Sequence, residues 1–119
     1  MKKVFVTLAT ATLATLSTSA QAGQQCGEAS YYGYKDNYAW KTTASGAIMN
    51  PNSMTTAHRS LPFGTKIKVI NKNNGKSVIV KVNDRGPFIV GRVLDLSYGA
   101  FIKIAPASQG ITKICYYKV

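Results

Sequence analysis

The segment from Thr65 to Asn83 most constrains the fold, because it contains two alternating runs of apolar and polar residues around a tight turn. Residues 65–70 (TKIKVI) and 77–83 (SVIVKVN) have the period of two that is expected of β-strands. Asn74-Gly75 between them suits the positive φ angles of a hairpin turn. These residues therefore predict an antiparallel β-hairpin.

Other short segments along the chain carry similar strand and turn signals. Further strands are predicted at 27–34, 91–96 and 111–117. Residues 97–104 predict a short helix with Ser97 as its N-cap, and residues 35–53, rich in Gly, Asn, Ser, Thr and Lys, predict a long loop. Many short strands with one or two helical turns indicate an all-β fold, a small closed β-barrel.

The first 22 residues have the composition of an export signal. Lys2 and Lys3 precede an uncharged run over 4–16, and residues 20–22 (AQA) supply the small side chains of a cleavage site. The run is too short for a membrane span, which needs about 20 apolar residues. We therefore predict a secretory signal peptide at 1–22, no membrane anchor, and one domain at 23–119 in the periplasm, the extracellular space or the cell wall.

Cys26 and Cys115 lie near the two ends of this predicted domain. An even pair of cysteines in an exported chain predicts a disulfide, with a reactive thiol as the alternative. Closing a loop of about 90 residues is worth roughly 4 kcal/mol on the chain-entropy model.

The predicted domain is strongly basic, with 13 Lys plus Arg against 4 Asp plus Glu. In an exported protein this charge favours envelope polyanions or an acidic protein over nucleic acid, although it also serves solubility alone. One His, two Cys and four carboxylates are too few and too scattered to predict a metal site. No Gly-rich phosphate loop is present, so we expect no nucleotide or other cofactor.

Few side chains of the domain can move protons near neutral pH. Asp84 follows an apolar strand and precedes a Gly-Pro turn, so its carboxyl either faces a cleft as an acid or caps the turn. His58 is either its polar helper or a structural residue. Asp95 alternates with two leucines, which favours a polar-face carboxylate over a catalytic one. No GxSxG element predicts a serine nucleophile.

Aromatic residues gather in one short stretch, where Tyr31, Tyr32, Tyr34, Tyr38 and Trp40 lie within ten residues. Such rings either stack on sugars or pack into a core.

Six segments together, in order and spacing, resemble the rare lipoprotein A (RlpA) family. They are 29–33 (ASYYG), 43–46 (TASG), 54–65 (MTTAHRSLPFGT), 74–75 (NG), 82–88 (VNDRGPF) and 91–97 (GRVLDLS). The similarity runs from about Ala29 to Ile104. It implies a six-stranded double-psi β-barrel with one or two short helices and a groove across one face, as in expansins.

The resemblance also implies an activity, endolytic peptidoglycan lytic transglycosylation. This reaction cleaves the bond between N-acetylmuramic acid (MurNAc) and N-acetylglucosamine (GlcNAc) without water and leaves a 1,6-anhydro-MurNAc end, preferentially on strands that lack stem peptides. By position, Asp84 is similar to the family's catalytic acid and His58 to its essential histidine. We expect a monomer whose partner is the glycan strand. The residues expected to contact it are Tyr31, Tyr32, Ser45, Arg59, Arg85 and Asp95.

The chain departs from the family pattern at Ala47, where members typically carry Glu. This departure favours a second hypothesis, a non-catalytic, expansin-like barrel that binds glycan. A third hypothesis is a basic protein ligand, such as an inhibitor of an acidic partner. The sequence also shows no lipobox cysteine and no SPOR domain, so septal targeting is not implied.

Overall fold

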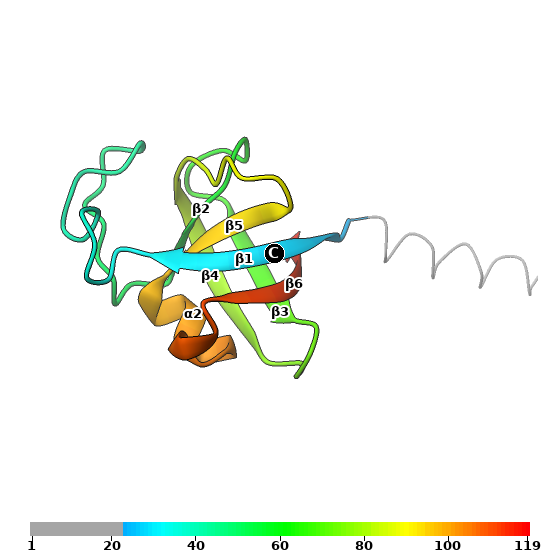
Figure 1. Ribbon diagram of the computed structural model, residues 1–119. Coiled ribbons are helices and arrows are strands. Elements are labelled where there is room, and N and C mark those ends of the chain that lie inside the picture. Colours follow the sequence, from blue (N-terminus) through cyan, green and yellow to red (C-terminus); the bar gives the residue numbers. More distant parts are fainter. Residues whose placement is uncertain (1–22) are drawn as a thin grey trace, which may run out of the picture.

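Six β-strands close into a barrel, and short helical elements pack at one end of it (Figure 1). The computed structural model describes residues 23–119, and the predicted signal peptide lies outside the described residues. The strands are β1 (Gln25–Tyr32), β2 (Thr55–Ala57), β3 (Lys66–Asn71), β4 (Ser77–Asp84), β5 (Arg92–Ser97) and β6 (Ile111–Lys118). The predicted closed, all-β barrel is confirmed.

The strand order around the barrel is β1-β5-β2-β4-β3-β6, and β6 pairs with β1 to close the ring. β1 pairs with β5 and β2 pairs with β4 in parallel, while the other four pairs are antiparallel. The predicted hairpin is the β3–β4 pair. Closure leaves no unpaired edge in the ring, which removes the usual site of edge-to-edge aggregation.

The structure differs from the predicted elements at two places. The first strand was expected at 27–34 but spans Gln25–Tyr32, because Gly33 has a φ of 86° and turns the chain. The strand β2 was not predicted, since three residues are too few to show a strand period. The expected long loop is present and contains one isolated bridge, between Thr42 and Ile48.

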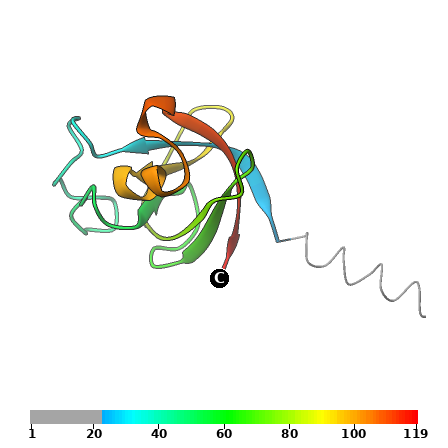
Figure 2. The ribbon, with the colours of Figure 1, turned by 90° about the horizontal axis from the view of Figure 1, so that it is seen from below.

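The helix α2 (Tyr98–Ile104) begins where the sequence predicts, because Ser97 Oγ accepts a hydrogen bond from Ala100 N at 3.2 Å. A 3₁₀ turn, η1 (Ala107–Gln109), follows α2 at the same end of the barrel (Figure 2). The buried side chains of α2 join the barrel interior. The core residues from the strands are Ala29, Ile67, Val69, Val80, Leu94, Leu96, Ile114 and Tyr116.

Cys26 and Cys115 form the predicted disulfide. They are direct cross-strand partners in the antiparallel pair of β1 and β6. The bond therefore joins the first strand to the last at the seam where the barrel closes, across 89 residues of sequence.

Replacing both cysteines by alanine is expected to lower the free energy of unfolding by about 2–4 kcal/mol, because the unfolded chain regains the entropy of a long open loop. Urea denaturation followed by circular dichroism measures this loss. An unchanged unfolding midpoint in the Cys26→Ala/Cys115→Ala variant would show that the strand pairing alone closes the seam.

Candidate active site

Two carboxylates lie in one row across the strands β4, β2 and β5. Ala57 of β2 is the register partner of Asp84 on one side and of Asp95 on the other. Ser30 of β1 extends the row, because it pairs with Asp95. The small side chain of Ala57 lies between the two acids, so both can face the same cleft on the outside of the barrel.

Irregular pairing brings Asp84 to this outer face. Thr56 pairs with Val82 and Ala57 pairs with Asp84, which leaves Asn83 as an extra residue in β4. Without this bulge, Asp84 would share the inward direction of Val82, which is fully buried. The bulge therefore turns the carboxylate from the core to the cleft.

A second irregularity brings a cation to the same place. Glu28 pairs with Arg92 and Ala29 pairs with Leu94, so Val93 is the extra residue in β5. As a result Arg92, three residues before Asp95, lines the same cleft.

The carboxylate of Asp84 accepts three hydrogen bonds from the protein. Oδ1 accepts from the backbone N–H groups of Ala44 and Arg85, each at 2.9 Å, and Oδ2 accepts from the Tyr32 hydroxyl at 2.6 Å. Burial and this hydrogen bond raise the pKa of Tyr32 far above its ordinary value, so the phenol keeps its proton. Two of these bonds come from backbone N–H groups, as the turn-capping alternative for Asp84 expects, and the residue also lines the cleft.

Asp95 has a different environment. Its Oδ1 accepts a hydrogen bond from Ser30 Oγ at 2.6 Å, and Ser30 Oγ in turn accepts one from Arg92 Nη1 at 3.0 Å. Burial raises the pKa of Asp95 above its ordinary value, although the Ser30 hydroxyl and the Arg92 guanidinium oppose this shift. Asp95 therefore holds a proton more readily than an exposed aspartate does.

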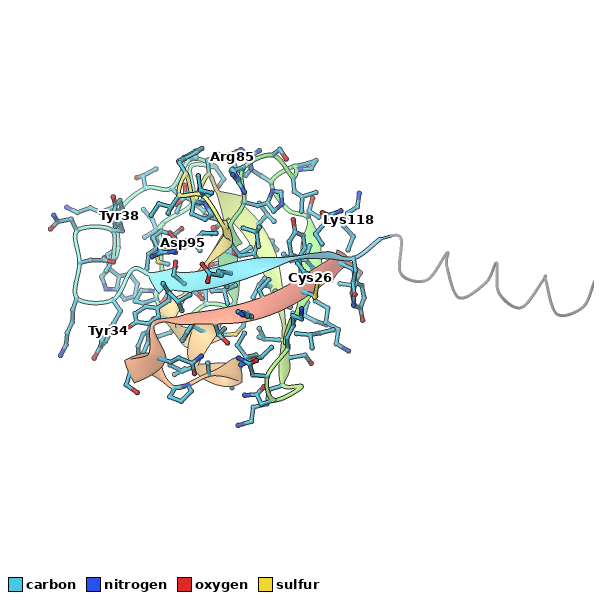
Figure 3. The ribbon with its side chains drawn as sticks, turned by 45° about the vertical axis from the view of Figure 1, so that its right-hand side comes forward. Cys26, Tyr34, Tyr38, Arg85, Asp95 and Lys118 are labelled. Atoms are coloured by element: carbon cyan, nitrogen blue, oxygen red, sulfur yellow. A yellow bond between two sulfur atoms is a disulfide. The ribbon has the colours of Figure 1, made fainter. Side chains whose placement is uncertain are left out.

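The cleft has a volume of about 370 Å³. Tyr38 and Phe88, which are 60% and 78% exposed, present aromatic surface at its rim, and Thr42 adds a hydroxyl. Figure 3 shows Tyr38, Arg85 and Asp95 on the same side of β1. Exposed aromatic rings beside polar groups in a cleft offer surface on which a planar or ring-shaped ligand can stack.

Three residues that were expected to contact substrate lie in this cleft, namely Tyr32, Arg85 and Asp95. Tyr31 does not, because successive strand residues face opposite sides and its ring packs against Tyr98 and Phe101. Contact of Tyr31 with a substrate stays a prediction.

Ser45 and Arg59 also lie outside the cleft. Ser45 lines a neighbouring pocket of about 480 Å³, together with Ala47 and Lys81. Arg59 is exposed and donates a hydrogen bond from Nη2 to the Arg92 carbonyl at 3.1 Å. The effect on turnover of Ala47, which lies in this neighbouring pocket, stays a prediction.

His58 directly follows Ala57 in the chain, but its ring lines a different pocket, of about 350 Å³, with Tyr116 and Lys118. Its Nε2 lies 2.6 Å from the Tyr116 hydroxyl, and its Nδ1 accepts hydrogen bonds from the N–H groups of Ser60 and Leu61. The ring therefore makes no hydrogen bond to the Asp84 side chain, because neighbouring residues at the end of β2 point to opposite sides, and the role of His58 in the reaction stays a prediction.

Several cleft residues were not among the expected site residues. Tyr38 belongs to the aromatic stretch that suggested sugar binding, so a signal for it was present. Arg92 and Phe88 enter the cleft through register and loop geometry, which have no signal in a single sequence. Ser30 contacts the cleft residues Asp95 and Arg92 through hydrogen bonds.

Within residues 23–119, no group of three or more His, Cys, Asp or Glu side chains is placed to hold a metal ion. No helix in that same region is long and apolar enough to cross a membrane.

The closed six-stranded barrel of mixed pairing, with its single α-helix in the described region, defines this domain as a double-psi β-barrel that carries an acidic cleft. Residues 24–116 match the family model described as "Lytic transglycolase". The chain belongs to this family.

Curated relatives share about half of the aligned residues. A "Probable endolytic peptidoglycan transglycosylase RlpA" from Nostoc sp. is 51% identical over 88 residues, which make up 74% of this chain and 24% of the relative. The "Endolytic peptidoglycan transglycosylase RlpA" of Vibrio cholerae is 46% identical over 90 residues, 76% of this chain and 34% of the relative. The chain thus spans about a quarter to a third of their length.

Solved structures with the same fold carry other functions in their titles. A "Streptomyces papain inhibitor" superposes with a TM-score of 0.65 at 25% identity, covering 82% of this chain and 96% of that one. A mutant expansin from Clavibacter michiganensis, in complex with cellohexaose, superposes with a TM-score of 0.64 at 25% identity, covering 81% of this chain and 50% of that one.

Replacing Ser30 by alanine is expected to raise the pKa of Asp95 further, because the hydroxyl donates its hydrogen bond most strongly to the charged carboxylate. The side-chain ¹³C shift of Asp95, followed against pH by NMR, measures the change. Ser30→Thr, which keeps the hydroxyl, serves as the matched control. A pKa that falls or stays constant in Ser30→Ala would contradict this account of the cleft.

The pKa of His58 is lowered by burial and by the nearby Arg59 and Arg85 guanidinium groups. The neutral ring is therefore favoured in the folded state. Its contribution to stability is complete above the ordinary His pKa of about 6.5 and is lost as the pH falls below it, since the unfolded chain then takes up a proton first. Between pH 7 and pH 5 the free energy of unfolding should fall more in the wild type than in His58→Asn. Equal slopes in urea denaturation would refute this linkage.

Proposed function

We propose that this chain is an exported lytic transglycosylase that cleaves the MurNAc–GlcNAc bond of peptidoglycan and leaves a 1,6-anhydro-MurNAc end. The observation that carries the proposal is the pair of carboxyl groups, Asp84 and Asp95, which face one cleft from different environments. The names of the curated relatives support this activity.

The hydrogen bonds favour Asp95 as the proton donor, a role that the sequence assigned to Asp84. Asp95 has the raised pKa and a single hydrogen bond from the protein, to Oδ1, whereas the carboxylate of Asp84 is held by three. Two carboxyl groups in different environments, one with a raised pKa, are a recurring arrangement in glycoside cleavage.

In the proposed reaction, Asp95 gives its proton to the glycosidic oxygen as the bond to MurNAc C1 breaks. The C6 hydroxyl oxygen of MurNAc then attacks C1, and its proton returns to Asp95, which restores the acid. The charge of Asp84 stabilises the positive charge that develops on the sugar ring. One carboxyl group can serve in both steps because no water has to be activated.

The surroundings of the cleft suit a glycan. Tyr38 and Phe88 offer exposed rings for stacking, and the Arg92 guanidinium lies at the floor. Removal of stem peptides frees a carboxylate on each MurNAc, so a strongly basic domain is expected to favour denuded strands electrostatically. We further propose that the domain acts as a monomer, outside the cytoplasm, where its disulfide is stable.

The second candidate function is glycan binding without cleavage. The similarity to half of an expansin that was solved in complex with cellohexaose favours it. The similarity to a papain inhibitor shows that this barrel also serves as a protein ligand, so the fold alone does not establish the chemistry.

The test is digestion of amidase-treated peptidoglycan by the chain lacking residues 1–22, followed by mass spectrometry of the soluble products. We expect products with 1,6-anhydro-MurNAc ends, and a loss of rate of about 100-fold or more in Asp95→Asn. Asp84→Asn should also lose rate, and a matched substitution outside the cleft, Lys68→Gln, should leave it close to wild type.

Two results would overturn parts of the proposal. Glycan that sediments with the protein but is never cleaved would establish the binding barrel instead. Full activity in Asp95→Asn together with none in Asp84→Asn would return the proton donor's role to Asp84.

A further inference from the structure

The ring of His58 lies outside the cleft, yet its hydrogen bonds define its protonation state. Nδ1 is 3.0 Å from both the Ser60 and the Leu61 backbone nitrogen atoms, and each of these groups can only donate. Nδ1 therefore carries no proton. The proton of the neutral ring is on Nε2, which donates to the Tyr116 hydroxyl at 2.6 Å. In this tautomer the unprotonated Nδ1 caps the turn by accepting from the Ser60 and Leu61 N–H groups.

The turn that His58 caps holds the side chain of Arg85. Nη1 of Arg85 donates to the carbonyl of Leu61 at 2.8 Å and to that of His58 at 3.2 Å. The guanidinium also lies 4.0 Å from the centroid of the Phe63 ring. Arg85 is thus held by groups whose positions depend on the capped turn.

Arg85 and the capped turn both hold Asp84 in place. The backbone N–H of Arg85 donates to Asp84 Oδ1, and the backbone N–H of His58 donates to the Asp84 carbonyl at 3.1 Å. With the guanidinium held on the turn, the cation stays away from the carboxylate beside it. A released Arg85 could pair with Asp84 and cancel its charge in the cleft.

We propose that His58 is a positioning residue, whose ring caps the turn at 58–61 so that the turn binds Arg85 and presents Asp84 to the cleft. This inference rests on the proposed function for its kinetic consequences, although the chain of contacts stands by itself. We define the Arg85 clamp as Arg85 with the carbonyls of His58 and Leu61. In this proposal His58 acts through the clamp and contacts neither the substrate nor the Asp84 carboxyl group.

Two substitutions of His58 separate this role from proton transfer. Asn places its Oδ1 where Nδ1 lies and can accept from Ser60 and Leu61, whereas Gln reaches toward the position of Nε2 and leaves the two N–H groups without an acceptor. Neither side chain titrates. His58→Asn should therefore keep kcat within about threefold of wild type, and His58→Gln should lose about tenfold or more with little change in KM.

Arg85→Met removes the clamp without touching the ring and should lower kcat like His58→Gln. If both act through the clamp, the double variant should be no more than about threefold below the worse single variant. Multiplying effects, or a His58→Asn variant as inactive as His58→Gln, would overturn the proposal, because both results indicate a direct role of the imidazole in the reaction. Thermal unfolding of each variant confirms that the domain is folded under the assay conditions.

An arm without substrate separates this inference from the proposed activity. In ¹H–¹⁵N NMR spectra, the amide signals of Ala44 and Arg85, which both donate to Asp84, should move in His58→Gln but stay in place in His58→Asn. In Arg85→Met, where residue 85 itself is replaced, the Ala44 signal alone is the reporter and should move. If the wild type never cleaves glycan, this pattern still tests the clamp. Unmoved amide signals in His58→Gln would overturn it even in an active enzyme.

Discussion

The short strand β2 is the constraint on which the rest of the structure depends. It is the only link between β5 and β4 in the ring of the described strands, antiparallel to one and parallel to the other. Without its three residues the barrel would open on the side that carries the cleft. Ala57, the last residue of β2, also sets the spacing of Asp84 and Asp95, because it pairs with both. The same strand pairing therefore closes the barrel and brings the two acids together.

The two acids differ because the strands beside them supply different partners. Asp84 lies at a strand end, where a crossing loop and the next peptide offer free N–H groups, and these stabilise its negative charge. Asp95 lies within a strand, where neighbouring N–H groups are used in pairing, so only the hydroxyl of Ser30 reaches it. Position along a strand thus decides how many hydrogen-bond donors reach each carboxyl group.

Features that depend on local chemistry could be predicted from the sequence. The alternation and the Asn-Gly turn predicted the hairpin, Ser97 predicted the helix start, and the paired cysteines predicted the disulfide. Long-range register could not be predicted in this way. The extra residues in β4 and β5 bring Asp84 and Arg92 to the outer face. Strict alternation of apolar and polar residues does not predict either bulge.

Tyr31 and His58 lie outside the cleft for the same physical reason. Each directly neighbours a residue that lines the cleft, and neighbours on a strand face opposite ways. The consequence extends to the fold as a whole, because one inserted or deleted residue in β4 or β5 would exchange the buried and cleft-facing sets of that strand end. Single-residue shifts in register thus change which side chains the barrel presents on its outer face, while the core stays the same. One core can therefore carry an acidic cleft, a sugar-binding groove or an inhibitory surface. The activity of such a domain therefore has to be argued from its bulges and the side chains that they turn outward.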